Sequence, residues 1–263
     1  MSLVVFRNVD KGYFKSGSAN YYQAVEGLNL EIEDGEFFCL LGPTGCGKTT
    51  VLTMLAGFEQ PSAGSIELGG HSITGPGRDR AVVFQGDDSL YGWLTARENV
   101  EFGPRARGLL SNERRDIADR YLELVGLKGQ GDKYPHELSG GMKQRIQIAR
   151  VLANDPSMLL MDEPFGALDA QTRRVMQYQL VRIWRASRKA VLFITHDIDE
   201  AIILANRIGV MRAGPASSIK GIVEIKLEGT RDRSDPKFVD YYLEVNKLIE
   251  EEVSKSLNTG EPG

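Results

Sequence analysis

The segment Gly42-Pro-Thr-Gly-Cys-Gly-Lys48-Thr49 decides the fold. It fits the pattern G-x-x-x-x-G-K-[ST], with an apolar run over 37–41 before it and a helix-forming run over 50–56 after it. Glycines inside the segment let successive backbone N–H groups turn toward one anion, and the start of the following helix adds its positive end. The segment is therefore interpreted as a phosphate-binding loop between a buried strand and a helix, which predicts an α/β fold.

Each position of this loop has an expected task. Lys48 would neutralise the β- and γ-phosphates of a nucleotide, and the Thr49 hydroxyl would ligate Mg²⁺. The predicted nucleotide-binding residues of the loop are Gly42, Pro43, Thr44, Gly45, Cys46, Gly47, Lys48, Thr49 and Thr50.

Bulk properties narrow the classes of protein. The chain has 263 residues and a formal net charge of −4, so no global charge attracts nucleic acid or an anionic membrane. No apolar run reaches the roughly 18 to 20 residues of a membrane span, and the N-terminus lacks a secretory pattern, so a cytosolic location is expected. Cys39 and Cys46 suit a reducing compartment and predict neither a disulfide nor a zinc site. Cys46 is an oxidation-sensitive thiol or a small loop residue.

Hydrophobic periodicity predicts strands that alternate with helices, which is typical of an α/β protein. Strands are expected over 3–9, 28–32, 37–41, 65–68, 81–84, 157–161, 190–194 and 208–211, and helices over 50–56, 116–125 and 140–154. The stretch from about 89 to 155 is interpreted as a helical subdomain inserted in the α/β core. After Gly214 the chain becomes polar, except for one amphipathic segment. The residues expected to share its apolar face are Phe238, Tyr241, Tyr242, Val245, Leu248 and Ile249.

A second signal is the apolar run over 158–161 that ends in two carboxylates, Asp162 and Glu163. Beside a phosphate loop, Asp162 can hold Mg²⁺ and Glu163 can act as the general base that deprotonates the attacking water. An exposed acidic strand end is the alternative interpretation of this run taken alone.

A third signal is Leu138-Ser-Gly-Gly-Met-Lys-Gln-Arg145, which simple phosphate-loop enzymes lack. Ser139 at a helix start, followed by Gly140 and Gly141, forms a second anion-binding terminus with free backbone N–H groups and a hydroxyl. One γ-phosphate site has no need of two such cradles in one chain. The second cradle makes sense if it completes the site of another subunit.

Together with Ala167-Leu-Asp169 and Ile194-Thr-His-Asp197, these motifs resemble the ATP-binding cassette (ABC) family, in the family's order and from about Leu3 to Met211. The resemblance implies a P-loop NTPase core with a mixed or parallel sheet, an antiparallel β subdomain and the inserted helical subdomain, with ATP and Mg²⁺ as cofactors. It also implies a cassette domain over 1–235, followed by a C-terminal helix and flexible tail over 236–263.

Site roles follow from the resemblance. Tyr13 matches the aromatic residue that stacks on adenine, Gln85 the residue that reaches Mg²⁺ and the attacking water, and His196 the catalytic switch residue at the γ-phosphate. Asp169 would join Ser139, Gly140 and Gly141 in contacting the nucleotide of the partner subunit. The implied catalytic set is Glu163, His196 and Gln85, and the metal set is Thr49, Gln85 and Asp162.

The stretch over 86–100, with Tyr91 and Trp93, is either a docking patch for a membrane partner or ordinary packing. This stretch, Met142 and Arg231-Asp-Arg233 resemble the ATPase subunits of bacterial nitrate, sulfonate and taurine importers, although Tyr91-Gly92 stands where that group usually has leucine and proline.

That resemblance implies a homodimer or a paired ABC subunit on the cytoplasmic face of the inner membrane. It also implies membrane permease subunits, an indirect solute-binding protein and no nucleic acid as a partner. A soluble ABC ATPase not linked to transport is the alternative. A small-molecule kinase is a third interpretation, but it leaves the cradle at Ser139 unexplained.

Overall fold

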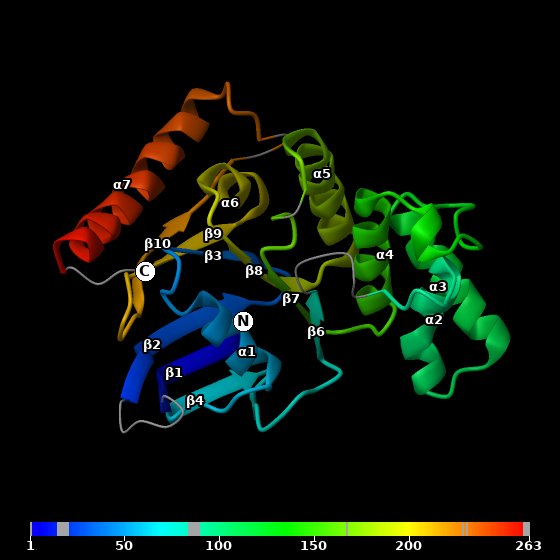
Figure 1. Cartoon of the computed structure of the whole chain (residues 1–263), viewed down its shortest axis with the longest axis horizontal. Helices are drawn as coiled ribbons and strands as arrows, with labels where there is room; N and C mark the ends of the chain where they lie inside the picture. Colours follow the sequence, from blue (N-terminus) through cyan, green and yellow to red (C-terminus); the bar gives the residue numbers. More distant parts are fainter. Residues whose placement is uncertain are drawn as a thin grey trace. The chain divides into compact units, whose positions relative to one another are not determined.

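The computed structural model describes residues 2–14, 21–83, 90–166, 168–227, 229 and 231–259. The chain divides into two compact units (Figure 1). The first unit combines residues 1–77 with 190–263, and the second comprises residues 78–189.

One sheet of the first unit is antiparallel throughout. It contains β1 (Ser2–Phe14), β2 (Tyr21–Glu33), β4 (Ala63–Leu68) and β5 (His71–Ser72) in the order β2-β1-β4-β5. In β2, buried Leu28, Leu30 and Ile32 alternate with exposed polar residues, so one face of the strand joins the core. This sheet matches the antiparallel subdomain expected from the sequence, although β1 and β2 extend beyond the predicted ranges.

The second sheet of this unit carries the phosphate loop. Its strands are β3 (Phe37–Leu41), β8 (Ala190–Thr195), β9 (Arg207–Met211) and β10 (Ile219–Glu224), in the order β10-β9-β3-β8. β3 runs parallel to both β8 and β9, and β10 pairs antiparallel with β9. Every residue of β3 and β8 is buried, as expected for parallel strands covered on both faces. The α/β prediction is confirmed.

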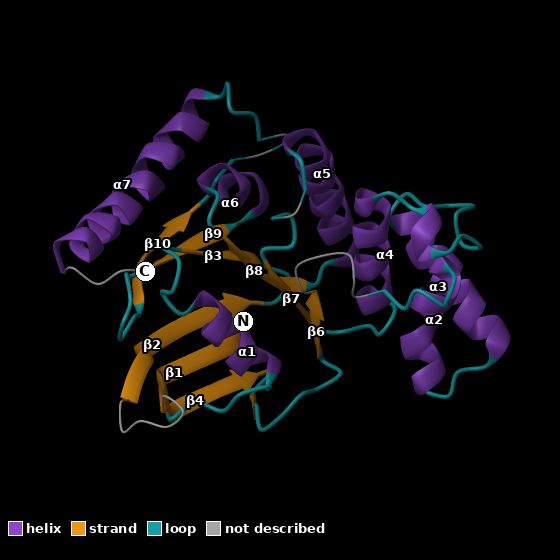
Figure 2. Ribbon diagram, in the orientation of Figure 1, coloured by secondary structure: helices purple, strands orange, loops and turns teal. Residues whose placement is uncertain are grey.

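In the described part of the first unit the helices are α1 (Lys48–Ala56), α6 (Ile198–Leu204) and α7 (Pro236–Thr259). Helix α7 packs on α6 and along β10 (Figure 2). Phe238 and Val245 of α7 are buried as predicted, but Tyr242 is 37% exposed. The predicted face is wrong at Tyr242 because the neighbouring Tyr241 faces the body of the unit, where its hydroxyl accepts a hydrogen bond from the Lys226 N–H.

The second unit pairs two parallel strands with a group of helices. The strands are β6 (Arg80–Val83) and β7 (Met158–Asp162). The helices are α2 (Ala96–Ala106), α3 (Ser111–Leu124), α4 (Gly140–Leu152) and α5 (Ala170–Ser187), with a short 3-10 turn over Pro135–Glu137. Helices α2, α3 and α4 pack against one another (Figure 1). Among the helices of the described ranges, none combines the length and the apolar character that crossing a bilayer requires.

Candidate functional site

The phosphate loop joins β3 to α1, and its backbone conformation needs glycine. Gly45 has φ +79° and Gly47 has φ +92°, both in the left-handed region that residues with a β-carbon adopt at a cost. Gly47 is the N-cap residue of α1 and offers no side-chain acceptor to the first N–H groups of the helix. The start of α1 therefore has no cap from the N-cap side chain, which suits the way helix N-termini bind phosphate.

Close packing around the loop gives a second reason for glycine. A β-carbon at Gly42 would lie 2.8 Å from Cys46 Sγ, and one at Gly47 would lie 3.1 Å from Val25 Cγ2 and 3.2 Å from the Ala24 carbonyl oxygen. At Gly45 a β-carbon would meet nothing within 4 Å. Gly42 and Gly47 therefore keep space for the backbone, while Gly45 serves conformation alone.

Lys48 lies inside this loop and is only 7% exposed. Its Nζ donates to the carbonyl oxygens of Gly42, at 2.8 Å, and of Pro43, at 2.9 Å. Carbonyls position the ammonium group without neutralising its charge, and burial of an unneutralised cation is costly. A bound phosphate supplies the missing negative charge, so the loop fits the group that its sequence predicts.

Cys46 is fully buried in the same loop, with Sγ 3.8 Å from Lys48 Nζ. Burial raises the pKa of the Cys46 thiol above its usual value, although the Lys48 ammonium acts in the opposite direction. The thiol is therefore protonated at neutral pH and poorly reactive, which supports the interpretation of Cys46 as a small loop residue.

Tyr13 lies on β1 beside the start of α1. Its hydroxyl hydrogen-bonds the side chains of Thr50 and Glu59, and Lys11 Nζ lies 5.0 Å from the centre of its ring. Burial raises the pKa of Tyr13, the Thr50 hydrogen bond lowers it and the Glu59 carboxylate raises it. The structure thus brings Tyr13 to Thr50, the last residue of the predicted nucleotide set.

Sequence reasoning missed two other aromatic residues near this edge. Phe14 is 77% exposed and its ring lies 5.1 Å from that of Tyr21. The Tyr22 hydroxyl donates to the Gly45 carbonyl oxygen at 3.4 Å, so it contacts the phosphate loop directly. The feature of the sequence that could have indicated them is the concentration of aromatic residues shortly before the phosphate loop.

His196 is exposed at the carboxyl end of β8. A buried network joins the residues on both sides of it. The Thr195 hydroxyl donates to Glu200 at 2.5 Å and accepts from the Asp197 N–H at 3.1 Å, while Asp197 caps α6 by accepting from the Glu200 N–H at 3.1 Å. His196 thus stands in a turn whose backbone is held by hydrogen bonds on its C-terminal side.

In the second unit, β7 ends at Asp162, and Glu163 follows in a turn closed by the Gly166 N–H to the Glu163 carbonyl at 3.1 Å. Glu163 has φ +42°, which is uncommon for a residue with a β-carbon and is typical of functional positions. Gln144 on α4 donates a short hydrogen bond from its side-chain amide to the Pro164 carbonyl oxygen. This contact joins the helix that begins at Ser139 to the turn that holds Glu163.

The residues predicted to act on the partner's nucleotide lie at two helix starts. Ser139 caps α4 by accepting from the Met142 N–H at 3.4 Å, and Asp169 caps α5 by accepting from the Gln171 and Thr172 N–H groups at 3.0 Å. A β-carbon at Gly141 would lie 3.3 Å from Thr172 Cγ2, so the two helix starts are adjacent. Hydrogen bonds from Thr172 lower the pKa of Asp169.

The residues predicted to bind the metal ion do not all lie in one described unit. Thr49 belongs to the first unit, Asp162 belongs to the second, and Gln85 lies outside the described residues. Within the described ranges no cluster of three or more His, Cys, Asp or Glu residues is arranged to hold a metal ion. Mg²⁺ at nucleotide sites typically takes several ligands from phosphates and water, so few protein ligands are needed, and a hydroxyl such as that of Thr49 has suitable chemistry.

Asn99 is a further residue that sequence reasoning missed. It is fully buried, accepts from the Tyr91 N–H at 2.9 Å and donates to the carbonyls of Tyr91, Leu94 and Thr95 at 2.9–3.1 Å. The turn that Asn99 shapes leaves Trp93 75% exposed. A buried amide inside an amphipathic helix was the available signal.

Comparison with known proteins places the chain in a family. The family described as ABC transporter matches residues 25–166, more than half of the chain. The nitrate import ATP-binding protein NrtD of Synechococcus elongatus is 46% identical over 229 residues, which cover 85% of this chain and 83% of that protein. The bicarbonate transport ATP-binding protein CmpC of Synechococcus elongatus is 47% identical over 238 residues, which cover 89% of this chain and 36% of that protein.

A solved structure of an ATP-binding cassette, dimeric in a post-hydrolysis state with ADP and Pi bound, superposes with a TM-score of 0.71 at 30% identity. The match covers 86% of this chain and 100% of that one. The chain therefore belongs to the ABC transporter family, and it is an ATPase subunit of that class. Its similarity to nitrate and bicarbonate transport subunits supports the anion-importer group within the family.

Proposed function

We propose that this ATPase is the motor subunit of an importer for a small anion such as nitrate, a sulfonate or taurine, and that it works by pairing with a second subunit on ATP. The observation that carries the proposal is the presence of two phosphate cradles in one chain. One is the uncapped start of α1 at Gly47, and the other is the start of α4 at Ser139.

The first cradle would bind the nucleotide of its own subunit. The backbone N–H groups between Gly42 and Thr49 would hold the β- and γ-phosphates, and Lys48 would turn from the loop carbonyls to the phosphate oxygens. Tyr13 would support adenine. Mg²⁺, held by Thr49, Gln85 and Asp162, would neutralise charge on the leaving phosphates.

Glu163 would act as the general base on the attacking water. Its left-handed backbone conformation ends the extended course of β7, and the contact between Gln144 and Pro164 holds the following turn. His196, held by the network of Thr195, would contact the γ-phosphate. Gln85 would orient the same water.

The second cradle would complete the partner's site. Ser139, Gly140 and Gly141 would face the partner's γ-phosphate, and Asp169 at the adjacent start of α5 would cross the interface. The dimeric solved cassette with ADP and Pi supports this arrangement. Closure on ATP and opening after hydrolysis would then drive the membrane partner.

The exposed Trp93, together with Phe102 at 45% exposure, would dock a permease subunit. Their aromatic group continues through Tyr91, whose ring centre lies 5.3 Å from that of Trp93 and 4.6 Å from that of Phe102. The 75% exposure of Trp93 argues against the core-packing interpretation, while the guanidinium group of Arg150 lies over the ring of the partly buried Tyr91.

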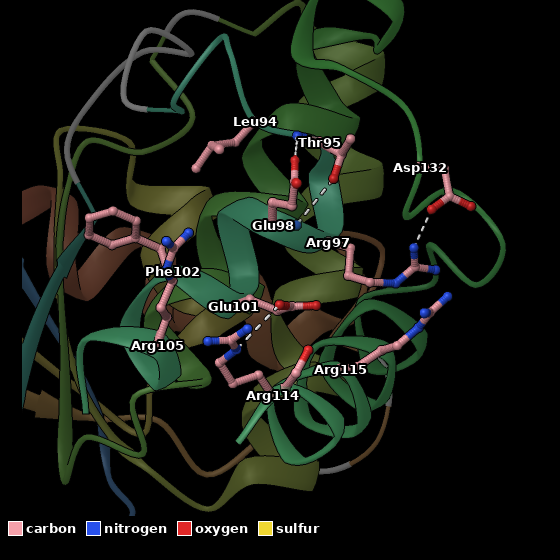
Figure 3. A pocket seen from close by; sticks show the side chains of 11 residues that line it. Leu94, Thr95, Arg97, Glu98, Glu101, Phe102, Arg105, Arg114, Arg115 and Asp132 are labelled. Atoms are coloured by element: carbon pink, nitrogen blue, oxygen red, sulfur yellow. Dashed lines mark hydrogen bonds and ion pairs between the residues drawn. The ribbon is translucent and has the colours of Figure 1, made fainter. Parts of the chain in front are cut away.

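A cavity of about 440 Å³ opens beside this patch (Figure 3). Its lining includes Leu94 and Phe102 together with charged side chains, among them Glu101, which pairs with Arg114. Most of the lining is charged, so the cavity suits a partner segment that offers complementary charges beside an apolar group. A permease bound here would keep the ATPase peripheral at the cytoplasmic face of the membrane, with a solute-binding protein engaged indirectly.

The test is a trapped dimer. Glu163→Gln should retain ATP binding, lose turnover and accumulate as an ATP-bound dimer in Mg-ATP, measured by size-exclusion chromatography with light scattering. Ser139→Arg added to this variant should abolish the dimer, because a bulky cation would fill the second cradle. A Glu163→Gln protein that hydrolyses ATP normally, or a dimer indifferent to the Ser139 change, would contradict the proposal.

Copurification separates the transport role from its alternative. An integral membrane protein that copurifies from the native host supports the importer. Recovery with nucleic acid instead would support a soluble ABC ATPase.

A further inference from the structure

The segment over 212–218, between β9 and β10, lies against the phosphate loop. A β-carbon at Gly214 would be 3.0 Å from the Gly45 carbonyl oxygen and 3.7 Å from Cys46 Cα. Gly214 therefore touches the backbone of the loop at one of its left-handed positions. Because the two backbones lie so close together, the position of Gly214 limits how far the loop can move toward the segment.

The same segment is also bound to β2. The Ala216 N–H donates to the Gln23 carbonyl at 2.7 Å, and the Ser217 N–H donates to the Ala24 carbonyl at 3.2 Å. That Ala24 carbonyl is the atom that would lie 3.2 Å from a β-carbon at Gly47. The segment thus adjoins the phosphate loop at two of its glycines, directly at Gly45 and through β2 at Gly47.

One side chain of the C-terminal helix α7 is hydrogen-bonded to the segment over 212–218. Glu252 on α7 is 3% exposed and accepts from the Ala213 N–H at 3.1 Å, one residue before Gly214. Its other oxygen forms an ion pair with Lys220 Nζ at 3.0 Å. A buried carboxylate is costly unless it is paired and hydrogen-bonded, and here both conditions are met.

Lys220 links β10 to the same stretch of α7 that carries Glu252. It lies on β10, donates to the Leu248 carbonyl oxygen at 3.0 Å and pairs with Glu251 at 2.6 Å. Burial alone would lower the pKa of Lys220, but the hydrogen bonds to Glu251 and Glu252 outweigh it and raise the pKa above its usual value. Lys220 therefore stays charged and places its ammonium group against the Glu252 carboxyl group beside Ala213.

We propose that Glu252 is a positioning residue for ATP: from α7 it holds Ala213, and so keeps Gly214 against Gly45 of the phosphate loop. The inference rests on the proposed function, because it takes this loop as the site of the phosphates. Docking of the C-terminal helix then strengthens nucleotide binding without any contact between the helix and the nucleotide.

The first test compares Glu252→Ala with Glu251→Ala in the full chain. Glu251 is the matched control because it precedes Glu252 on α7 and pairs with the same lysine, yet its side chain is 49% exposed and the Ala213 N–H bonds to Glu252 instead. Titration with a fluorescent ATP analogue should show binding weakened roughly three- to tenfold in Glu252→Ala, since part of a charged hydrogen bond's free energy reaches the loop. Glu251→Ala should stay within about twofold of wild type, as expected for an exposed ion pair.

Two further measurements distinguish positioning from general structure. Glu252→Ala should raise KM for ATP and leave kcat nearly unchanged, because Glu252 does not touch the reacting atoms. Hydrogen exchange over 212–218 should accelerate in Glu252→Ala and not in Glu251→Ala, since only the former removes the acceptor of the Ala213 N–H.

A second variant acts at the other end of the contact and decides the matter if Glu252→Ala fails to fold. Gly214→Ala would press a β-carbon onto the Gly45 carbonyl, whereas Gly75→Ala meets nothing within 4 Å. Weaker ATP binding in Gly214→Ala but not in Gly75→Ala supports the inference. Wild-type binding in both Glu252→Ala and Gly214→Ala overturns it and leaves the proposed function intact. Loss of binding in Lys48→Ala confirms that the assay reports on the loop, and a wild-type protein that binds no nucleotide overturns both.

Discussion

The backbone at Glu163 predicts that removal of this side chain to glycine stabilises the protein more than removal to alanine. Glu163 has φ +42°, and this left-handed conformation costs a residue with a β-carbon about 1–2 kcal/mol. Alanine keeps that cost and glycine removes it. Both variants lack the carboxylate, so the comparison between them isolates the backbone.

The magnitude is a difference of two terms. Relief of about 1–2 kcal/mol is opposed by the larger unfolded-state entropy of glycine, about 0.4–1 kcal/mol. The net gain for Glu163→Gly over Glu163→Ala is about 1 kcal/mol, which corresponds to about 2–4 °C in Tm for a chain of this size. Both variants should lose turnover by about 10²- to 10⁴-fold, the usual effect of a missing general base.

Differential scanning calorimetry on the two variants, with ATPase assays alongside, measures both effects. Asp162 provides the control pair, because it ends β7 without a positive φ. There Asp162→Gly should be less stable than Asp162→Ala by about 0.5–1 kcal/mol. The reasoning is refuted if Glu163→Gly is no more stable than Glu163→Ala. It is also refuted if the glycine and alanine variants rank in the same order of stability at positions 163 and 162.

Lys48→Ala should lose most ATP affinity, because it removes the buried cation that faces the phosphates; unchanged binding of a fluorescent ATP analogue would contradict this. Trp93→Ala should leave basal ATPase activity and Tm near wild type yet weaken recovery with permease-containing membranes, whereas a clear drop in Tm would favour packing. The Lys189 hydrogen bond lowers the pKa of Asp155, so the pair stabilises the fold above the unfolded carboxyl pKa, and this contribution is lost as pH falls through the lower folded pKa. Asp155→Asn should therefore be slightly destabilising near pH 7 and neutral in strong acid, which urea titrations at the two pH values can check.

Much of the core could be predicted because buried parallel strands are continuous apolar runs. β3 has the predicted bounds, and β8 extends the predicted range 190–194 by one residue. β1 and β2 were predicted too short because bulges interrupt their alternation, with register shifts between Phe6 and Val9 and again up to Gly12. β10 was missed: it pairs with β9, and its mixed sequence Ile219-Lys-Gly-Ile-Val-Glu224 lacks a buried run.

The candidate site also contains parts that the sequence predicts and parts that it does not. The motifs of Lys48, Glu163 and Ser139 could be recognised in the sequence because each of these residues stands at a local turn or a helix start, and their proposed roles depend on that position. Contacts between distant segments left no local pattern. Glu252 reaches Ala213 across 39 positions of the chain, and no periodicity in either segment indicates the pair.

Helix capping adds a structural task to the proposed roles of several candidate site residues, and this affects which substitutions they tolerate. Ser139 and Asp169 are the N-cap residues of α4 and α5, and Asp197 next to His196 caps α6. Loss of such a cap costs about 0.5–2 kcal/mol whatever the side chain does in catalysis. In a saturation mutagenesis map selected for abundance alone, these positions should accept Asn, Ser, Thr and Asp and reject aliphatic residues. In a second map selected for transport, each position should accept only its native residue. Substitutions that pass the abundance selection but fail the transport selection would then identify the functional contribution of each side chain separately from its contribution to folding.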